Sequence, residues 1–134
     1  MRIGVPICED IWGEEVVETL AETGAEILIS PNGSPFDWPK PDLRMNVAVA
    51  RVTESKLPLV YLNQVGGQDE LVFDGASFVL NSACSLAAQL PAWQEALVVT
   101  EWTKGVKGWT CAKSEFAKIE EDDASAYQAC VLGL

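Results

Sequence analysis

Two apolar runs separated by an amphipathic stretch open this chain, and this order restricts the fold more than any other feature. Ile3–Ile7 alternates apolar residues as a β-strand does, and residues 25–30 are almost continuously apolar, as in a sheet covered on both faces. Between them, residues 12–23 place valine and leucine at spacings of three and four, with glutamates on the other side. The order strand, helix, strand predicts a layered α/β fold.

The same order returns further along the chain. An apolar stripe predicts a helix over residues 43–56, Pro58 forbids its extension, and residues 59–63 are predicted to be the next strand. Gly66-Gly67 and Asp74-Gly75 are expected to form turns. Further strands are predicted within residues 71–81, 85–90 and 95–102, and residues 114–134 have helical propensity that an acidic run interrupts.

The bulk composition excludes several classes of protein. The 134 residues fit one domain or a piece of a larger protein, and 49% of them are hydrophobic, which suffices for a core. A net charge of -11 argues against nucleic acid or an anionic membrane surface as a partner, because both would repel the chain. With no signal peptide or transmembrane run evident, we expect a cytoplasmic protein with free thiols.

The cysteine and histidine content restricts the chemistry. None of the four cysteines forms a CxxC pair and histidine is absent, so we expect no metal site and no disulfide framework. The lack of histidine also excludes a Cys–His or Ser–His catalytic pair within the chain. A nucleophilic cysteine would therefore need a Glu, Asp or Lys as its base.

Cys8 is the candidate nucleophile, because it ends the first strand and two acids follow it directly. Glu9 and Asp10 cannot be buried cheaply, so this strand end must face a polar cleft or solvent. A helix beginning near residues 10–12 would stabilise a thiolate, and the Glu9 backbone N–H would point toward the oxygen of an attacked carbonyl. The alternative is that Cys8 is a small buried hydrophobe, as many unpaired cysteines are.

A loop over residues 30–42 follows the second strand and carries four of the seven prolines. The carboxyl end of a strand is where α/β sheets place ligand sites. Within this loop, the plain interpretation of Ser34 is a turn former and that of Lys40 is a solvated surface lysine. Asp69 and Glu70 are expected to line or brace the cleft without a catalytic role.

Three motifs are similar to those of the nitrilase superfamily. They are PICEDIW at residues 6–12, N-x-S-P at residues 32–35 followed by Lys40, and NQVGGQDELVFDGASFVLN at residues 63–81. The last motif is long, and it resembles one branch, the glutaminase domains of glutamine-dependent NAD synthetases. The resemblance covers residues 3–102. It implies part of an αββα four-layer sandwich that is truncated at its N-terminal side.

The resemblance also implies roles for particular residues. Cys8 matches the nucleophile that attacks the side-chain amide of glutamine and becomes a γ-glutamyl thioester, and the Glu9 backbone N–H matches an oxyanion donor. Ser34 and Lys40 match positions that hold glutamine. A zwitterionic amino acid needs a hydroxyl and charged groups to orient it, which agrees with these residue types.

The resemblance further implies that parts of the machinery lie outside this chain. The family's general-base Glu and its Lys lie upstream of the nucleophile, so we expect the isolated chain to be inactive. Residues 1–113 resemble the C-terminal half of the glutaminase domain, and residues 114–134 resemble a linker or helix leading toward a synthetase domain. We expect no cofactor in this chain, with ATP and Mg²⁺ belonging to the missing synthetase domain. The missing N-terminal half and that domain are then its partners, beside the substrate glutamine.

Two alternatives remain open from the sequence. The first is another nitrilase-type amidase, such as an ω-amidase or a carbamoylase, although the motif at residues 63–81 and the apolar end YQACVLGL argue against it. The second is a non-catalytic fragment that mainly self-associates. Half of a sandwich exposes a sheet face and strand edges, and such surfaces drive pairing, so we expect a homo-oligomer.

Overall fold

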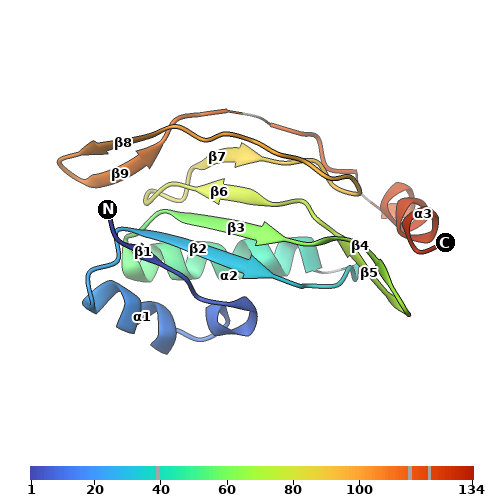
Figure 1. Ribbon diagram of the computed structural model, residues 1–134, viewed down its shortest axis with the longest axis horizontal. Helices are drawn as coiled ribbons and strands as arrows, with labels where there is room; N and C mark the ends of the chain where they lie inside the picture. The colour runs from blue at the N-terminus through green and yellow to red at the C-terminus, as the bar shows by residue number, and fades with distance from the viewer. Residues whose placement is uncertain (39, 115, 121) are drawn as a thin grey trace.

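The computed structural model describes residues 1–38, 40–114, 116–120 and 122–134, and its centre is a five-stranded sheet (Figure 1). The strand order is β1-β2-β3-β6-β7, in which the first three strands are parallel and β6 and β7 each run antiparallel to the strand before. The strands are β1 (Ile3–Gly4), β2 (Ile27–Asn32), β3 (Leu59–Asn63), β6 (Phe78–Leu80) and β7 (Leu86–Gln89). The predicted layered α/β fold is confirmed.

Two helices connect the parallel strands and cover one face of the sheet. The helix α1 (Glu15–Glu22) leads from β1 to β2, and α2 (Lys40–Ser55) leads from β2 to β3. Their apolar sides meet the sheet in the main core, which includes Val17, Leu28, Ala48, Val52, Leu59 and Leu80. Parallel strands have their carboxyl ends on the same side of the sheet, and this side is called the sheet edge below. The segments that follow β1, β2 and β3 therefore come together there (Figure 1).

The opposite face of the sheet is covered only in part. The hairpin of β8 (Trp102–Gly105) and β9 (Gly108–Cys111) supplies residues to a second apolar cluster on the side of β6 and β7. Over β1 and β3 the face is open, and there Ile3 and Leu62 are 47% and 41% exposed. This face therefore leaves apolar side chains in contact with solvent.

The elements around the candidate nucleophile differ in length from the predictions. The first strand was predicted to reach Ile7 but ends at Gly4. Pro6 lacks the backbone N–H that a sheet ladder requires, which explains the early end. The helix predicted over residues 43–56 begins earlier, at Lys40, and Pro41 fits its first turn because the missing N–H is not needed there.

The turn predicted at Gly66-Gly67 is wrong. Both glycines lie within β4 (Val65–Gln68), which pairs with β5 (Leu71–Asp74) in a hairpin. The chain reverses instead at Asp69, whose φ of 53° lies in the left-handed region that a tight turn requires.

The strand predicted over residues 95–102 is also wrong for most of its length. Only Trp102 belongs to a strand, β8, while Leu97 and Val99 are 97% and 84% exposed. These apolar residues follow a strand-like pattern, but the described part of the chain offers them no neighbouring strand with which to form a ladder.

The C-terminal helix packs against the β4–β5 hairpin through glycine. The helix α3 (Asp122–Leu132) is shorter than the predicted helical region, and its end lies over Gly67. A β-carbon at Gly67 would lie 2.9 Å from the Leu132 carbonyl oxygen and 3.3 Å from the Gly133 α-carbon. Both are backbone atoms, so the helix end could not remain in place beside any larger residue.

We therefore expect Gly67→Ala to loosen α3 and to lower the free energy of unfolding by about 1–3 kcal/mol. Hydrogen exchange across residues 122–132 measures the loosening, and urea unfolding measures the stability. Gly105→Ala is the matched control, because a β-carbon there meets no atom nearer than 3.9 Å. Unchanged exchange in α3 of Gly67→Ala would contradict the close approach.

Candidate active site

Cys8 begins a short 3-10 turn at the common edge of the parallel strands. This turn, η1 (Cys8–Ile11), directly precedes α1, which starts only at Glu15. The expectation that a helix begins near residues 10–12 and stabilises the thiolate is therefore wrong, because a four-residue turn lacks the aligned dipoles of a longer helix. Cys8 instead has a φ of 51°, a left-handed conformation that costs a non-glycine residue about 1–3 kcal/mol and is concentrated at functional sites.

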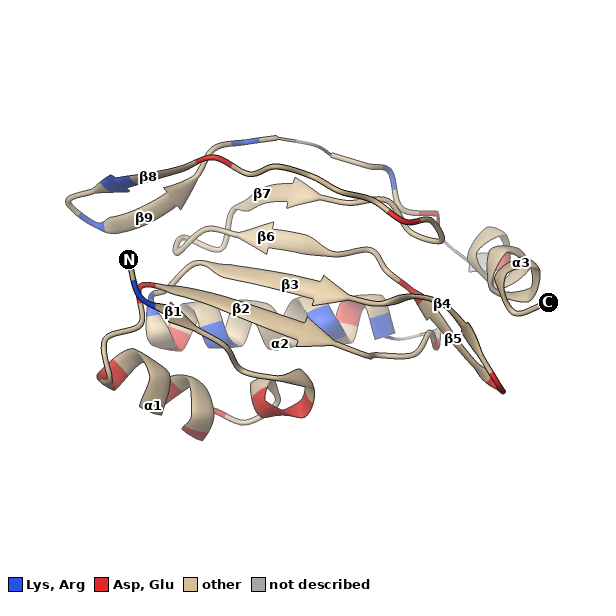
Figure 2. Ribbon diagram, viewed as in Figure 1, with Lys and Arg blue, Asp and Glu red and all other residues tan. Residues whose placement is uncertain are grey.

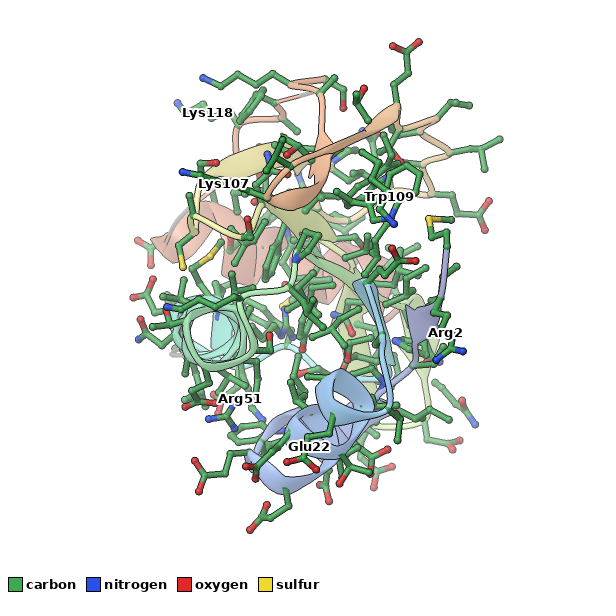
Figure 3. All side chains as sticks on the ribbon, turned by 90° about the vertical axis from the view of Figure 1, so that its left-hand side faces the viewer. Arg2, Glu22, Arg51, Lys107, Trp109 and Lys118 are labelled. Atoms are coloured by element: carbon green, nitrogen blue, oxygen red, sulfur yellow. The ribbon has the colours of Figure 1, made fainter. Side chains whose placement is uncertain are left out.

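The turn that carries Cys8 is held at both ends. At its start, a carboxylate oxygen of Asp10 accepts a hydrogen bond of 2.9 Å from the Ile7 backbone N–H. At its end, Arg51 of α2 donates to the carbonyl oxygens of Ile11 and Trp12 at 3.3 and 2.9 Å. Figure 3 shows Arg51 between α2 and the α1 side of the molecule. Asp10, the second of the two acids that follow Cys8, therefore helps to hold this turn in place.

The Glu9 backbone N–H follows Cys8 directly along the chain. Within the described residues no hydrogen-bond acceptor is found for it, whereas the next N–H along the chain donates to the Ile7 carbonyl at 3.1 Å. A backbone N–H that follows a nucleophile directly and has no internal partner is suited to bind a developing oxyanion.

Ser34 lies after β2 and is bound to Asn63 at the end of β3. The Ser34 backbone N–H donates to the Asn63 side-chain oxygen at 2.9 Å, and the Asn63 side-chain nitrogen donates to the Ser34 carbonyl at 3.1 Å. These reciprocal bonds fix the loop between β2 and α2 onto the neighbouring strand end. Ser34 is half-buried and close to the sheet edge.

A buried ion pair lies beneath this loop. Arg44 of α2 donates to a carboxylate oxygen of Asp74 at 2.7 Å, and the two residues are 5% and 3% exposed. The prediction of a hairpin turn at Asp74-Gly75 is thus wrong, because Asp74 is the last residue of β5 and its carboxylate points into the protein. A buried carboxylate must be paired to be tolerated, and Arg44 supplies the pairing.

Lys40 links the loop to the turn of Cys8. Its ammonium lies 5.5 Å from the centre of the Trp12 ring, within the range of a cation–π interaction. Asp69 and Glu70 do not brace a cleft as predicted, since both are exposed at the tip of the β4–β5 hairpin (Figure 2). Hairpin geometry carries them away from the sheet edge at which Cys8 lies.

Tyr61 of β3 places a phenol among these groups. Burial raises the pKa of Tyr61, the Arg44 charge and a hydrogen bond from Ser34 oppose this rise, and negative charge at Cys8 and Asp74 adds to it. The phenol is therefore neutral at physiological pH. Its ring stacks on that of Phe78, with 5.0 Å between centroids.

A cavity beside the loop of Ser34 does not include Cys8 in its walls. It has a volume of about 450 Å³ and lies on the α2 side of the loop, where its walls include Phe36, Trp38, Arg44 and Glu120. Cys8, Ser34 and Lys40 lie outside this lining, at a half-buried surface.

In the part of the chain that the structure describes, no cluster of three or more Cys, Asp or Glu side chains could hold a metal ion. Among the same residues, no helix is both long and apolar enough to cross a bilayer.

The other cysteines differ in their surroundings. Cys111 is buried, and burial raises the pKa of its thiol, which makes it unreactive. Cys84 is half-buried and contacts Thr53, while Cys130 is exposed on α3. None of the three lies on the turns that surround Cys8.

With this geometry in hand, comparison with known proteins defines the family. The carbon-nitrogen hydrolase family matches residues 1–109, and the chain belongs to that family. A glutamine-dependent NAD(+) synthetase from Rhodobacter capsulatus is 50% identical over 134 residues, which is all of this chain and 24% of that protein. The chain thus spans about a quarter of the length of this relative.

Solved structures agree with the family and with the predicted nitrilase-like fold. A glutamine-dependent NAD+ synthetase from Acinetobacter baumannii, in complex with ADP, matches with a TM-score of 0.86 and 37% identity over 97% of this chain and 24% of that chain. An amidase of the nitrilase superfamily from Nesterenkonia matches with a TM-score of 0.60 and 27% identity, over 66% of this chain and 33% of that chain. A further structure of that amidase carries a covalent acetamide addition at its active-site cysteine.

The sequence did not predict the residues whose hydrogen bonds hold the site in place. Asn63, Arg44 and Asp74 were not predicted to have a role, although together they hold Ser34. A signal was present for Asn63, which follows an apolar strand at the edge where ligand sites lie. No comparable signal marks Arg44, because an arginine in an amphipathic helix is usually solvated.

Proposed function

We propose that this chain carries the nucleophile and part of the substrate site of a glutaminase. In this proposal the Cys8 thiolate attacks the side-chain amide carbon of glutamine, and the Glu9 backbone N–H binds the oxyanion. The amide nitrogen is then protonated, the carbon–nitrogen bond breaks and ammonia leaves, so that a γ-glutamyl thioester remains on Cys8. Water hydrolyses the thioester to glutamate and restores the thiol. The observation that carries the proposal is the left-handed conformation of Cys8, followed by a Glu9 N–H for which the described residues supply no acceptor.

Ser34 and Lys40 are proposed to hold the amino-acid end of glutamine. Both belong to the segment after β2, and the contact between Lys40 and Trp12 brings that segment to the turn of Cys8. A hydroxyl and an ammonium suit the carboxylate of a zwitterion.

The remaining machinery is proposed to come from other parts of the full protein. A glutamate base and a lysine would activate Cys8, and a synthetase domain with ATP and Mg²⁺ would use the ammonia to convert deamido-NAD to NAD. Residues 1–113 would then be half of the glutaminase domain, and residues 114–134 would lead toward the synthetase domain. The open face over β1 and β3, which exposes Ile3 and Leu62, fits either the missing half or a second copy of the chain in a homo-oligomer.

A different amidase of the same superfamily is the second candidate. The likeness to the Nesterenkonia amidase favours it, since that protein also reacts through a cysteine. The two candidates differ in substrate, because only a glutaminase must recognise an α-amino acid.

Labelling with a glutamine-shaped electrophile, 6-diazo-5-oxo-norleucine, tests the proposal on the chain itself. We expect selective alkylation of Cys8, mapped by mass spectrometry and slowed by glutamine. Iodoacetamide reports general thiol exposure, with exposed Cys130 as the internal reference and buried Cys111 as the unreactive one. Equal labelling of Cys8 and Cys130 that glutamine does not slow would contradict an assembled glutamine site.

A further inference from the structure

Ser34 is held by a single arginine through several bonds at once. Arg44 donates from Nε to the Ser34 hydroxyl at 3.0 Å and from Nη2 to the Ser34 carbonyl at 2.8 Å. The same Nη2 donates to the Pro35 carbonyl at 3.1 Å. A planar fork that binds a hydroxyl and two carbonyls fixes both the backbone and the side chain of its partner.

Asp74 in turn fixes Arg44. Its carboxylate accepts from Arg44 Nη1 at 2.7 Å, and its other oxygen lies 3.4 Å from the Asn63 side-chain nitrogen. Two positions earlier on β5, the Val72 carbonyl accepts from the Phe36 N–H at 2.7 Å. Strand β5 therefore supports the loop at Phe36 directly and at Ser34 through Arg44.

Arg44 is placed to act through Ser34 and not on a substrate. All three nitrogens of its guanidinium already have acceptors within the protein, and only 5% of the residue is exposed. Lys40 is half-buried and the partner described for it is the Trp12 ring, so its ammonium keeps the capacity to bind a ligand.

The direction of the Arg44 bond determines what the Ser34 hydroxyl can do. A guanidinium N–H only donates, so the Ser34 oxygen accepts from Arg44, and the Ser34 hydrogen is shared between the neighbouring Tyr61 phenol and any ligand that displaces it. A carboxylate only accepts hydrogen bonds, so it is the end of a zwitterionic substrate that suits this hydrogen.

We propose that Arg44, held by Asp74, is a positioning residue that makes the Ser34 hydroxyl a donor to the α-carboxylate of the substrate. This inference rests on the proposed glutaminase function. It adds that β5, through Asp74 and Arg44, holds the Ser34 hydroxyl in the orientation that this contact requires.

The test needs a complete enzyme, which a chimera provides by placing this chain in the matching segment of the Rhodobacter capsulatus relative. Glutamate release is measured with glutamine and with glutamine α-amide, which lacks the carboxylate. Arg44→Lys is expected to raise KM for glutamine about tenfold while kcat changes little. With the α-amide, Arg44→Lys and the unsubstituted chimera should give the same kcat/KM.

A mutant cycle separates positioning from general damage. Ser34→Ala should raise KM as Arg44→Lys does, and the double variant should be no worse than Ser34→Ala alone. If Arg44→Lys does not fold, Asp74→Asn takes its place. It should also raise KM for glutamine, because it removes the charge that holds Arg44. Asn81→Ala is the matched control, because Asn81 makes two hydrogen bonds to the Cys111 backbone at the opposite end of β6 and should leave KM unchanged.

Each result bears on a distinct claim. Equal KM penalties with glutamine and the α-amide, or additive effects in the cycle, would overturn the positioning role of Arg44. A folded, unsubstituted chimera that releases no glutamate would instead overturn the proposed function, and this inference with it.

Discussion

Cys8→Ala is expected to lower kcat for glutamine hydrolysis in the chimera by at least about 10³-fold, because loss of the nucleophile removes the benefit of the whole catalytic unit. KM should change much less, since Cys8 contributes to bond formation more than to binding. Glutamate release under saturating glutamine measures the effect. Cys130→Ala is the control, because Cys130 is exposed on α3 and lies outside the site.

The same assay on the isolated 134-residue chain should show negligible turnover. A thiol without a base is mostly protonated at neutral pH, and the chain contains no histidine to act as one. Turnover by the isolated chain at the rate of the chimera, lost in Cys8→Ala, would contradict the need for groups from elsewhere in the protein.

Asp74→Ala is expected to lower the free energy of unfolding by about 3–5 kcal/mol, because it leaves the buried Arg44 guanidinium without its carboxylate. Both partners are at least nine-tenths buried, so water cannot replace the lost bond. Urea unfolding of the chain measures the change. A loss of this size is a large part of the stability of an ordinary domain.

Two further variants separate charge from volume at this pair. Asp74→Asn keeps the shape and one acceptor oxygen and should cost less than Asp74→Ala. Joint replacement, Arg44→Met with Asp74→Leu, should recover much of the loss, because removing both charges leaves neither one buried alone. A loss below about 1 kcal/mol in Asp74→Ala would show that the pair is solvated in solution.

The elements that sequence patterns predicted well are those whose burial is regular. The predicted strand over residues 59–63 coincides with β3, because its apolar residues are bounded by Pro58 and a polar strand end. The strand–helix–strand order of the first thirty residues was also correct. Where burial is irregular the predictions failed, as at residues 95–102, which have a strand pattern but find no partner strand among the described residues.

Turns were the least predictable feature. Gly66-Gly67 was expected to reverse the chain, but Gly67 pairs with Val72 of β5, and the end of α3 packs directly on it. Asp74-Gly75 carried a turn signal as well, yet Asp74 is a buried ion-pair partner. In both cases a contact distant in sequence took precedence over a local preference.

The sequence by itself determined the class of fold, the candidate nucleophile and the candidate substrate residues. Cys8, Ser34 and Lys40 belong to short motifs whose residue types already indicate the chemistry. Only the tertiary structure decided that Arg44 and Asp74, 30 positions apart, form a buried pair beneath Ser34. The physical reason is that periodicity and local preference report which residues of one element face inward. Which charges then meet depends on where the fold places α2 and β5 relative to one another, and no local pattern records that.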